Sequence, residues 1–152
     1  MEKKLCILLF EDDPFQREVI REYLDMEGRY LVYEAKGIYH ALAICECAHP
    51  SVDVVLLDMA MTRVDMVDLV LAIRDRRPDM AILGMTDCPA DLYEEPRLRA
   101  SRAGFIPKPF NPFRLDRSIQ AVIRDGSTHR WHRTRIANQS KVDSAPVRIR
   151  TN

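Results

Sequence analysis

The segment DVVLLD, residues 53–58, decides the fold of this chain. Four consecutive apolar residues between two aspartates are typical of a strand that is buried on both faces of a parallel sheet. We therefore predict a strand over residues 53–57, followed directly by Asp58. The run LCILLF at residues 5–10 has the same character and also ends at acidic residues, beginning with Glu11. Strands of this kind need helices on both sides to cover them.

Outward from these two strands, apolar runs alternate with amphipathic helical patterns. Further short strands are predicted at residues 30–34, 80–85 and 105–106. Helices are predicted at residues 14–27, 38–48, 67–76 and 112–124, with a poorer one at residues 90–102 that Pro96 interrupts. A strand and a helix thus alternate five times. This order predicts an α/β fold, a doubly wound (βα)5 parallel sheet in three layers, α/β/α.

Charge divides the chain into two segments. Residues 1–125 hold 17 Lys and Arg against 22 Asp and Glu, a net of −5, whereas residues 126–152 hold 6 against one, a net of +5. We expect residues 1–125 to form one domain and residues 126–152 to be a basic linker or flexible tail, or the start of a truncated output module. The acidic charge of the first segment argues against nucleic-acid binding by the folded domain.

The cysteines and the apolar runs indicate a cytoplasmic protein. We expect free and mostly buried thiols in a reducing compartment, at Cys6, Cys45, Cys47 and Cys88. A metal cluster of Cys45, Cys47 and His49 is disfavoured, because Cys47 would point away from the other two on a helix. The first apolar run is too short for an export signal, and no stretch approaches the roughly 20 apolar residues of a membrane span.

Polar residues follow four of the five predicted strands. They are Glu11, Asp12 and Asp13 after the first, Asp58 after the third, Thr86 after the fourth and Lys108 after the fifth. Each alone is commonly a polar loop, a helix cap or a turn. The carboxyl ends of parallel strands meet at one edge, so together they predict one cleft. Its carboxylates favour a hard divalent cation, Mg²⁺, and the set suits phosphoryl transfer.

Four segments resemble the receiver domain family of response regulators in bacterial two-component systems. They are LLFEDDP at residues 8–14, VVLLDMAM at 54–61, ILGMT at 82–86 and FIPKPF at 105–110, and the resemblance covers roughly residues 3–125. It implies a flavodoxin-like fold with strand order 2-1-3-4-5, like that of the chemotaxis-Y proteins.

The resemblance also implies roles for individual residues. Asp58 would be the phosphoacceptor. Asp12 would bind Mg²⁺ directly and Glu11 mainly through water, with Asp58 and the Ala60 carbonyl completing the protein ligands. Asp13 is a weaker ligand candidate.

Beyond the metal ligands, the resemblance implies residues that bind the phosphoryl group and respond to it. Thr86 would be the switch hydroxyl and Phe105 the switch aromatic residue, moving into space that Thr86 vacates. Lys108 would bind the phosphoryl group, and its bond to Pro109 would be cis.

Several positions depart from the pattern of the family. Thr62 stands where proline is usual, Met66 where glycine is usual, and Asp87 where a small residue is usual. We expect Asp87 to slow phosphorylation by anionic donors. Phe105 lacks a hydroxyl group. Together with Pro96 and Pro107, this predicts an atypical face around the fourth helix and the last strand.

The resemblance implies a signalling switch, not a turnover enzyme. A phosphohistidine on a sensor histidine kinase or phosphotransfer protein would be the donor, and a downstream effector, a further domain or a homodimer would receive the signal. One alternative is a pseudo-receiver, an interaction module that works without phosphorylation. Another, an aspartate-dependent phosphatase, needs a second aspartate where Ala60 stands. The basic tail leaves open a PilZ-type nucleotide-binding module, or contact of Trp131 with nucleic acid.

Overall fold

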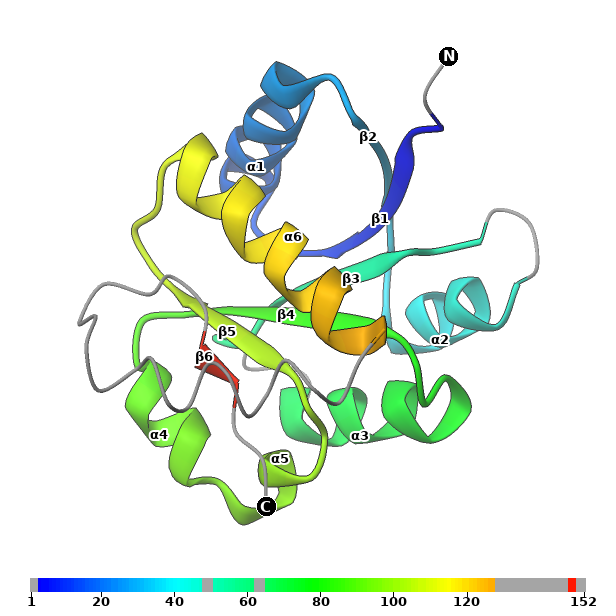
Figure 1. Ribbon diagram of the computed structural model, residues 1–152, viewed down its shortest axis with the longest axis vertical. Helices are drawn as coiled ribbons and strands as arrows, with labels where there is room; N and C mark the ends of the chain where they lie inside the picture. The colour runs from blue at the N-terminus through cyan, green and yellow to red at the C-terminus, as the bar shows by residue number, and fades with distance from the viewer. Residues whose placement is uncertain (1–2, 48–50, 62–64, 128–147, 150–152) are drawn as a thin grey trace.

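The computed structural model of the chain describes residues 3–47, 51–61, 65–127 and 148–149 (Figure 1). Its strands are β1 (Leu5–Phe10), β2 (Tyr30–Glu34), β3 (Val54–Asp58), β4 (Ala81–Thr86), β5 (Gly104–Pro107) and β6 (Arg148–Ile149). Its helices are α1 (Pro14–Glu27), α2 (Ile38–Glu46), α3 (Met66–Arg76), α4 (Pro89–Glu94), α5 (Pro96–Arg99) and α6 (Pro112–Ser127).

The strands form one sheet in the order β2-β1-β3-β4-β5-β6. Strands β1 to β5 are all parallel, so the predicted strand order 2-1-3-4-5 is confirmed. The two-residue strand β6 adds an antiparallel neighbour to the outer edge of β5. It comes from the C-terminal segment expected to be a linker or tail, of which residues 128–147 lie outside the described part.

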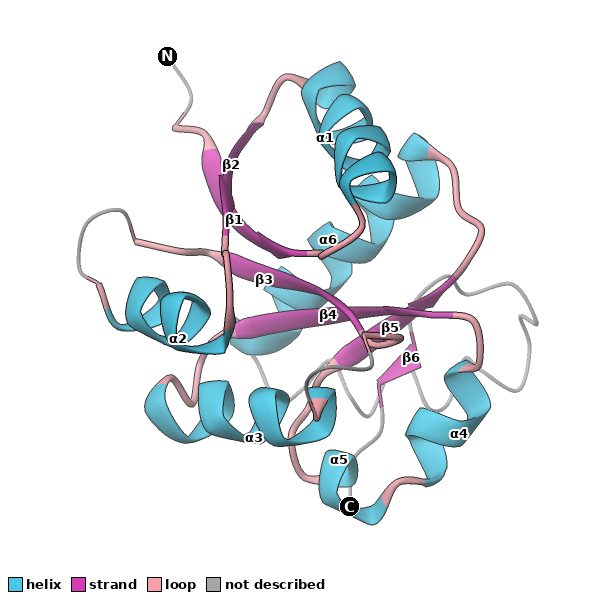
Figure 2. Cartoon of the chain, turned by 180° about the vertical axis from the view of Figure 1, so that it is seen from behind, coloured by secondary structure: helices cyan, strands magenta, loops and turns pink. Residues whose placement is uncertain are grey.

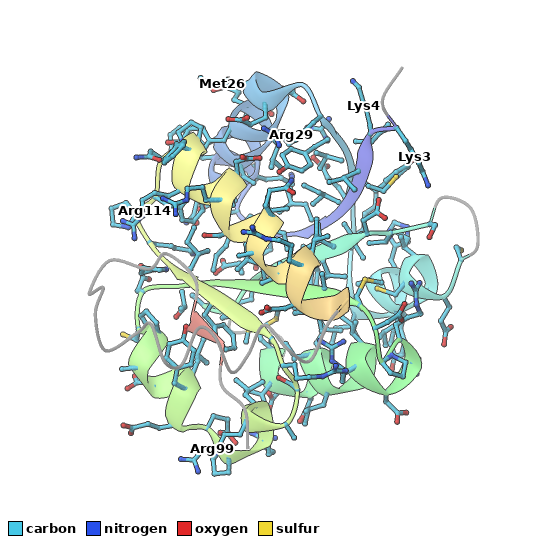
Figure 3. All side chains as sticks on the ribbon, in the orientation of Figure 1. Lys3, Lys4, Met26, Arg29, Arg99 and Arg114 are labelled. Atoms are coloured by element: carbon cyan, nitrogen blue, oxygen red, sulfur yellow. The ribbon has the colours of Figure 1, made fainter. Side chains whose placement is uncertain are left out.

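Helices cover both faces of the sheet, as the three-layer prediction required (Figures 1 and 2). Side chains of β1 alternate between the faces: Ile7 and Leu9 pack with α1 and α6, and Leu8 and Phe10 pack with α2 and α3. Figure 3 shows side chains filling the space between the sheet and both layers. Apolar burial on both faces accounts for the uninterrupted apolar runs in the sequence.

The long helix α1 follows its local sequence signals. Asp13 caps it by accepting hydrogen bonds from the N–H groups of Phe15 and Gln16, at 2.8 and 3.1 Å. Pro14 occupies the first turn, where no N–H donor is needed. Gly28 ends the helix with a φ of 68°, a left-handed conformation that glycine adopts without strain. Asp13 is therefore a helix cap, which agrees with its lower rank as a metal ligand.

Several element boundaries differ from the predicted ones. Strands β3 and β4 each begin and end one residue later than expected, and β5 extends to four residues. The poor helix over residues 90–102 is two short helices, α4 and α5, which meet at Glu95. Pro96 lacks an N–H donor, so it starts a new helix and does not continue the first one. Helix α2 ends at Glu46, short of the predicted residue 48.

One arginine closes the amino ends of β4 and β5. The guanidinium of Arg74 donates hydrogen bonds to the carbonyls of Pro78 (2.9 Å), Met80 (2.6 Å) and Ser101 (2.6 Å). Pro78 and Met80 precede β4, and Ser101 precedes β5. A single side chain of α3 thus satisfies carbonyls from two loops at this end of the sheet.

The cysteines are free, but the expectation that they are mostly buried is wrong for two of them. Cys45 is buried and Cys6 is half-buried, whereas Cys47 and Cys88 are exposed. Both exposed residues lie just beyond the end of an element, Cys47 after α2 and Cys88 after β4. His49, the third member of the disfavoured metal cluster, lies outside the described residues. In the described part of the chain, no helix is long and apolar enough to cross a bilayer.

Candidate functional site

Three carboxylates meet at the carboxyl ends of β1 and β3. Oxygen atoms of Glu11, Asp12 and Asp58 all lie within 4.8 Å of one another. Glu11 and Asp58 are buried, at 1% and 5% exposure, whereas Asp12 faces solvent. The convergence predicted from the strand ends is therefore present.

Glu11 is buried in surroundings that disfavour its negative charge. One of its oxygens, Oε1, accepts the N–H of Asp13 at 3.0 Å, but its buried Oε2 accepts no hydrogen bond from the described residues. Burial, reinforced by the charge of Asp58, raises the pKa of Glu11 to about 7, although the Asp13 amide and Lys108 oppose the shift. A divalent cation between the carboxylates would relieve both the orphaned oxygen and the repulsion. These residues therefore fit a hard cation such as Mg²⁺.

Lys108 follows β5 and reaches Asp58 from the β5 side of the sheet, whereas Glu11 and Asp12 lie on the β1 side. Its Nζ lies 2.9 Å from Oδ1 of Asp58, and the same oxygen accepts the N–H of Ala60 at 3.0 Å. The Lys108 side chain is 17% exposed and that of Asp58 is 7% exposed. Because the ion pair is shielded from bulk water, the attraction between its two charges is stronger than in a fully exposed pair. The Lys108–Pro109 bond is cis, as the resemblance implied.

Thr86 lies at the end of β4 and is 6% exposed. Its carbonyl accepts the backbone N–H of Lys108 at 2.8 Å, and its Oγ1 accepts the N–H of Cys88 at 3.1 Å. The first bond continues the pairing of β4 and β5 beyond Pro107, which has no N–H of its own. Thr86 and Lys108 are thereby held side by side, while the neighbouring Asp87 is exposed.

Phe105 points into the protein and is 2% exposed. Its ring meets that of Tyr93 in α4 edge-to-face, with centroids 5.5 Å apart at 75°. Gly84 of β4 stands directly opposite Phe105 in the ladder. A Cβ at position 84 would lie 2.7 Å from Phe105 Cδ1 and 2.7 Å from Met59 Cγ. Sequence reasoning missed this packing, although a glycine inside a strand is a recognised signal of close approach.

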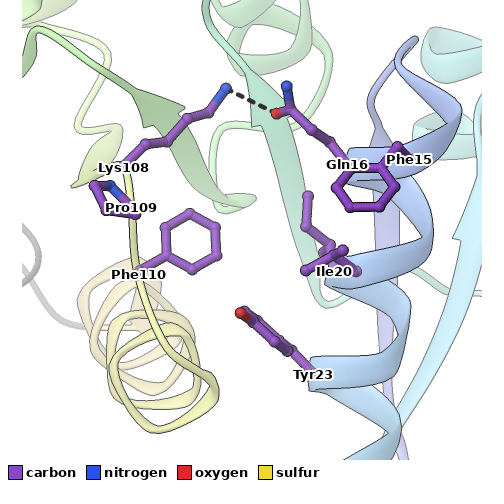
Figure 4. A pocket seen from close by; sticks show the side chains of 8 residues that line it. Phe15, Gln16, Ile20, Tyr23, Lys108, Pro109 and Phe110 are labelled. Atoms are coloured by element: carbon purple, nitrogen blue, oxygen red, sulfur yellow. Dashed lines mark hydrogen bonds between the residues drawn. The ribbon is translucent and has the colours of Figure 1, made fainter.

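An open groove lies beside Lys108, between α1 and the segment that follows β5. It has a volume of about 270 Å³ and is lined mainly by apolar side chains, among them Phe15, Ile20 and Phe110 (Figure 4). Phe15 is 77% exposed at its rim. Gln16 accepts a hydrogen bond from Lys108 Nζ at 3.3 Å, drawn as a dashed line in Figure 4. The sequence patterns did not identify the groove or Gln16.

Two positions at which the chain departs from the family pattern follow Asp58 in sequence. Met66 is buried at the first turn of α3, which Asp65 caps, and Thr62 lies outside the described residues. The site as a whole combines a group of acidic side chains that fits a cation, a shielded carboxylate and a lysine. These are the parts needed to transfer a phosphoryl group to a carboxylate.

Comparison with known families gives a direct match. Residues 7–120 match the family model described as "Response regulator receiver domain". The transcriptional regulatory protein CpxR of Klebsiella pneumoniae is 32% identical over 118 residues, which are 78% of this chain and 49% of that protein. An uncharacterized 14.6 kDa protein of Leptolyngbya boryana is 32% identical over 120 residues, or 77% and 88% of the two chains. The chain spans about half the length of CpxR.

Solved structures agree with the sequence comparison. The chemotaxis protein CheY4 of Vibrio cholerae superposes with a TM-score of 0.67 at 26% identity, covering 78% of this chain and 98% of that one. The receiver domain of the sensor histidine kinase PA1611 from Pseudomonas aeruginosa, which has a magnesium ion coordinated in its active-site cleft, superposes with a TM-score of 0.66 at 25% identity. It covers 79% of this chain and 98% of its own. The acidic group, the lysine and these matches lead to one conclusion: the chain belongs to the response regulator receiver domain family of two-component signalling.

Proposed function

We propose that Asp58 accepts a phosphoryl group in a Mg²⁺-dependent reaction, and that the product controls a downstream partner or domain. The observation that carries the proposal is the meeting of Glu11, Asp12 and Asp58 with Lys108 at one edge of the sheet. Membership of a phosphoacceptor signalling family agrees with it. The chain consumes itself as the acceptor in this scheme, so it acts as a switch.

The carboxylates of Glu11, Asp12 and Asp58 and the carbonyl of Ala60 would hold Mg²⁺. The buried Oε2 of Glu11, which accepts no hydrogen bond from the described residues, supports this assignment, as does the magnesium ion in the PA1611 receiver domain. When bound, the ion neutralises charge on phosphoryl oxygens. It would also offset the repulsion between the buried carboxylates of Glu11 and Asp58.

The two oxygens of Asp58 have different roles in this proposal. The hydrogen bonds that Lys108 and the Ala60 N–H donate both fall on Oδ1. This leaves Oδ2 to attack phosphorus. The O–P bond forms as the N–P bond of a donor phosphohistidine breaks, and the imidazole leaves with the electron pair. Lys108 would then stabilise a phosphoryl oxygen, and the hydroxyl of Thr86 would turn from the Cys88 N–H to bind another.

The partners follow from this chemistry. The donor would be a sensor histidine kinase or a phosphotransfer protein, whose apolar side chains could pack in the groove beside Lys108, against the exposed Phe15. CpxR is about twice as long as the matched region, and by its name regulates transcription. We propose likewise that residues 1–125 act as the receiver, with output passing to a partner protein, a second copy or a further domain. The basic segment 126–152 would be the connection.

Incubation with Mg²⁺ and acetyl phosphate, followed by intact mass spectrometry, tests the proposal. We expect the mass of one phosphoryl group to be added to the wild-type protein. The gain should disappear in Asp58→Asn and when Mg²⁺ is removed with a chelator. Asp91→Asn, an exposed aspartate of α4, is the matched control and should still gain the group. A wild-type protein that gains nothing from any donor would instead support the pseudo-receiver.

A further inference from the structure

Gly84 creates the space that Phe105 occupies. Real Cβ atoms are essentially never found within 3.0 Å of another heavy atom, yet a Cβ here would lie 2.7 Å from Cδ1 and 2.9 Å from Cε1 of the Phe105 ring. Both residues lie inside strands, directly opposite each other. Neither backbone can withdraw without breaking the ladder. Any side chain at position 84 is therefore incompatible with the present position of the ring.

The other walls of this space are also fixed by the fold. Met59 lies over Gly84 from the β3 side, and its N–H donates to the Met85 carbonyl at 2.9 Å. Tyr93 of α4, itself 3% exposed, closes the space with its ring. Gly84, Met59 and Tyr93 thus pack around Phe105. Among these wall contacts, none involves the carboxylate of Asp58 or the hydroxyl of Thr86.

The chemistry of Phe105 favours the same position. A phenyl ring has no hydroxyl group that gains hydration when it moves to the surface, so leaving the pocket only exposes apolar area. It would also leave a cavity beside Tyr93 and Met59. Both effects oppose an outward position.

We infer that Gly84 is a positioning residue that holds Phe105 inward whether or not Asp58 carries a phosphoryl group. The comparison of the two states of Asp58 rests on the proposed function. In this arrangement the ring does not swing on phosphorylation. The signal reaches the output surface through the backbone around Thr86 and Lys108, whose carbonyl and N–H are hydrogen-bonded. The α4–β5 surface would then have one side-chain arrangement in both states, unlike the outcome expected from the family resemblance.

Fluorine NMR of the full chain, with a fluorinated phenylalanine placed at position 105, tests this inference. The spectrum is recorded before and after addition of Mg²⁺ and beryllofluoride, a mimic of the phosphoryl group. We expect one resonance with a small solvent-isotope shift, as for a buried ring, before and after the addition. A ring that is solvent-exposed before the addition and buried after it would overturn the inference.

The same spectrum separates failure of this inference from failure of the proposed function. Bound beryllofluoride has its own fluorine resonances, which should disappear in Asp58→Asn. If they are missing in the wild-type protein, the proposed function fails, while a buried ring at position 105 still supports the role of Gly84. If they are present and the ring moves from outside to inside, the inference alone fails.

Variants of Gly84 provide the second arm. In Gly84→Ala we expect the label at position 105 to become solvent-exposed, because the methyl group occupies its place. Ala81→Val is the matched control: Ala81 is a small buried residue of the same strand that packs on the opposite face, so the label should stay buried. A label that stays buried in Gly84→Ala contradicts the inference.

A rescue experiment covers the case in which Gly84→Ala is too unstable to study. The double variant Gly84→Ala, Phe105→Ala removes the ring that the new methyl group would meet. We expect it to melt at a higher temperature than Gly84→Ala alone, whereas the same Phe105→Ala change should lower the melting temperature of the wild-type protein. If Phe105→Ala lowers both melting temperatures equally, the two positions are not coupled and the inference fails.

Discussion

The two halves of the carboxyl edge of the sheet are built in opposite ways. The acidic half, Glu11, Asp12 and Asp58, gathers like charges at the ends of β1 and β3, and Glu11 and Asp58 are buried. The aromatic half, Gly84, Tyr93 and Phe105, is neutral and closely packed. Lys108 follows the aromatic half in sequence but pairs with Asp58 in the acidic half.

This difference shows how one edge can combine stability with response. The buried charges of the acidic half destabilise the folded protein. A cation that binds between them, or a proton on Glu11, would therefore stabilise the folded state. The aromatic half takes its stability from packing, which does not depend on ions. The following predictions test this division, beginning with the largest effect.

Tyr93→Ala should reduce the free energy of unfolding by about 3–5 kcal/mol, because it removes a large buried ring and leaves a cavity beside Phe105. Chemical denaturation measures the loss. Tyr39→Ala, which changes a tyrosine that is 89% exposed, is the control and should change stability by less than about 0.5 kcal/mol. The loss at Tyr93 should be the same with and without Mg²⁺. If the loss depended strongly on Mg²⁺, the stability of the aromatic half would not be independent of the ion.

The stability of the metal-free protein should fall as the pH rises from about 4.5 to about 7. Over this interval the folded protein keeps a proton on Glu11, whose pKa is raised from 4.5 to about 7, whereas the unfolded chain has lost it. The contribution is fully present below pH 4.5 and amounts to at most about 3 kcal/mol. Denaturation of wild type and Glu11→Gln in a chelator, compared across pH, isolates this group. If the stability of wild type and of Glu11→Gln changes with pH in the same way, the pKa of Glu11 is not raised in the folded protein.

Mg²⁺ should stabilise the acidic half specifically. At a concentration ten times the dissociation constant, binding to the folded state adds about 1.4 kcal/mol. Thermal melting with increasing Mg²⁺ measures this as a rising midpoint. Asp12→Asn should remove most of the rise, and Tyr93→Ala should retain it despite a lower starting midpoint. An equal response of wild type and Asp12→Asn would argue against the acidic half as the ion site.

Asp87 should have the smallest effect. It is exposed beside Thr86, where its charge repels an anionic donor. We expect Asp87→Ala to react a few-fold faster with acetyl phosphate, a gain of about 1 kcal/mol or less. The rate of phosphoprotein formation, followed by mass at low and high salt, measures it. At high salt the difference in rate between the wild-type protein and Asp87→Ala should become smaller. If Asp87→Ala reacts no faster than the wild type at low salt, Asp87 does not slow phosphorylation.

The acidic half was predictable from the sequence, and most of the aromatic half was not. Glu11, Asp58 and Lys108 directly follow apolar runs, and the parallel topology brings the ends of such runs to one edge. The fit between Gly84 and Phe105 depends on how two strands pair and where a ring turns. Sequence periodicity contains neither piece of information. Gln16 was missed for a similar reason: its contact with Lys108 joins residues 92 positions apart and follows no repeating pattern.

Helix and strand boundaries show the same difference between local signals and contacts across the sheet. Signals confined to neighbouring residues, such as Asp13, Pro14 and Gly28 around α1, were sufficient to place its ends. Pro96 marked a break correctly, but the independent second helix that it begins was not foreseen. The strand β6 depends on pairing with β5 across more than 40 residues, so local sequence could suggest an extended conformation but not its neighbour.

Arg74 fixes the amino ends of β4 and β5 relative to each other. Its guanidinium donates to loop carbonyls at the amino ends of both β4 and β5, on the edge opposite Asp58. A guanidinium presents its donors in a rigid planar fork, so a lysine could not substitute for it. The two strands are therefore fastened at one end and carry Thr86 and Lys108 at the other. We therefore expect a change at Thr86 and Lys108 to leave the register at the amino ends of β4 and β5 unaltered.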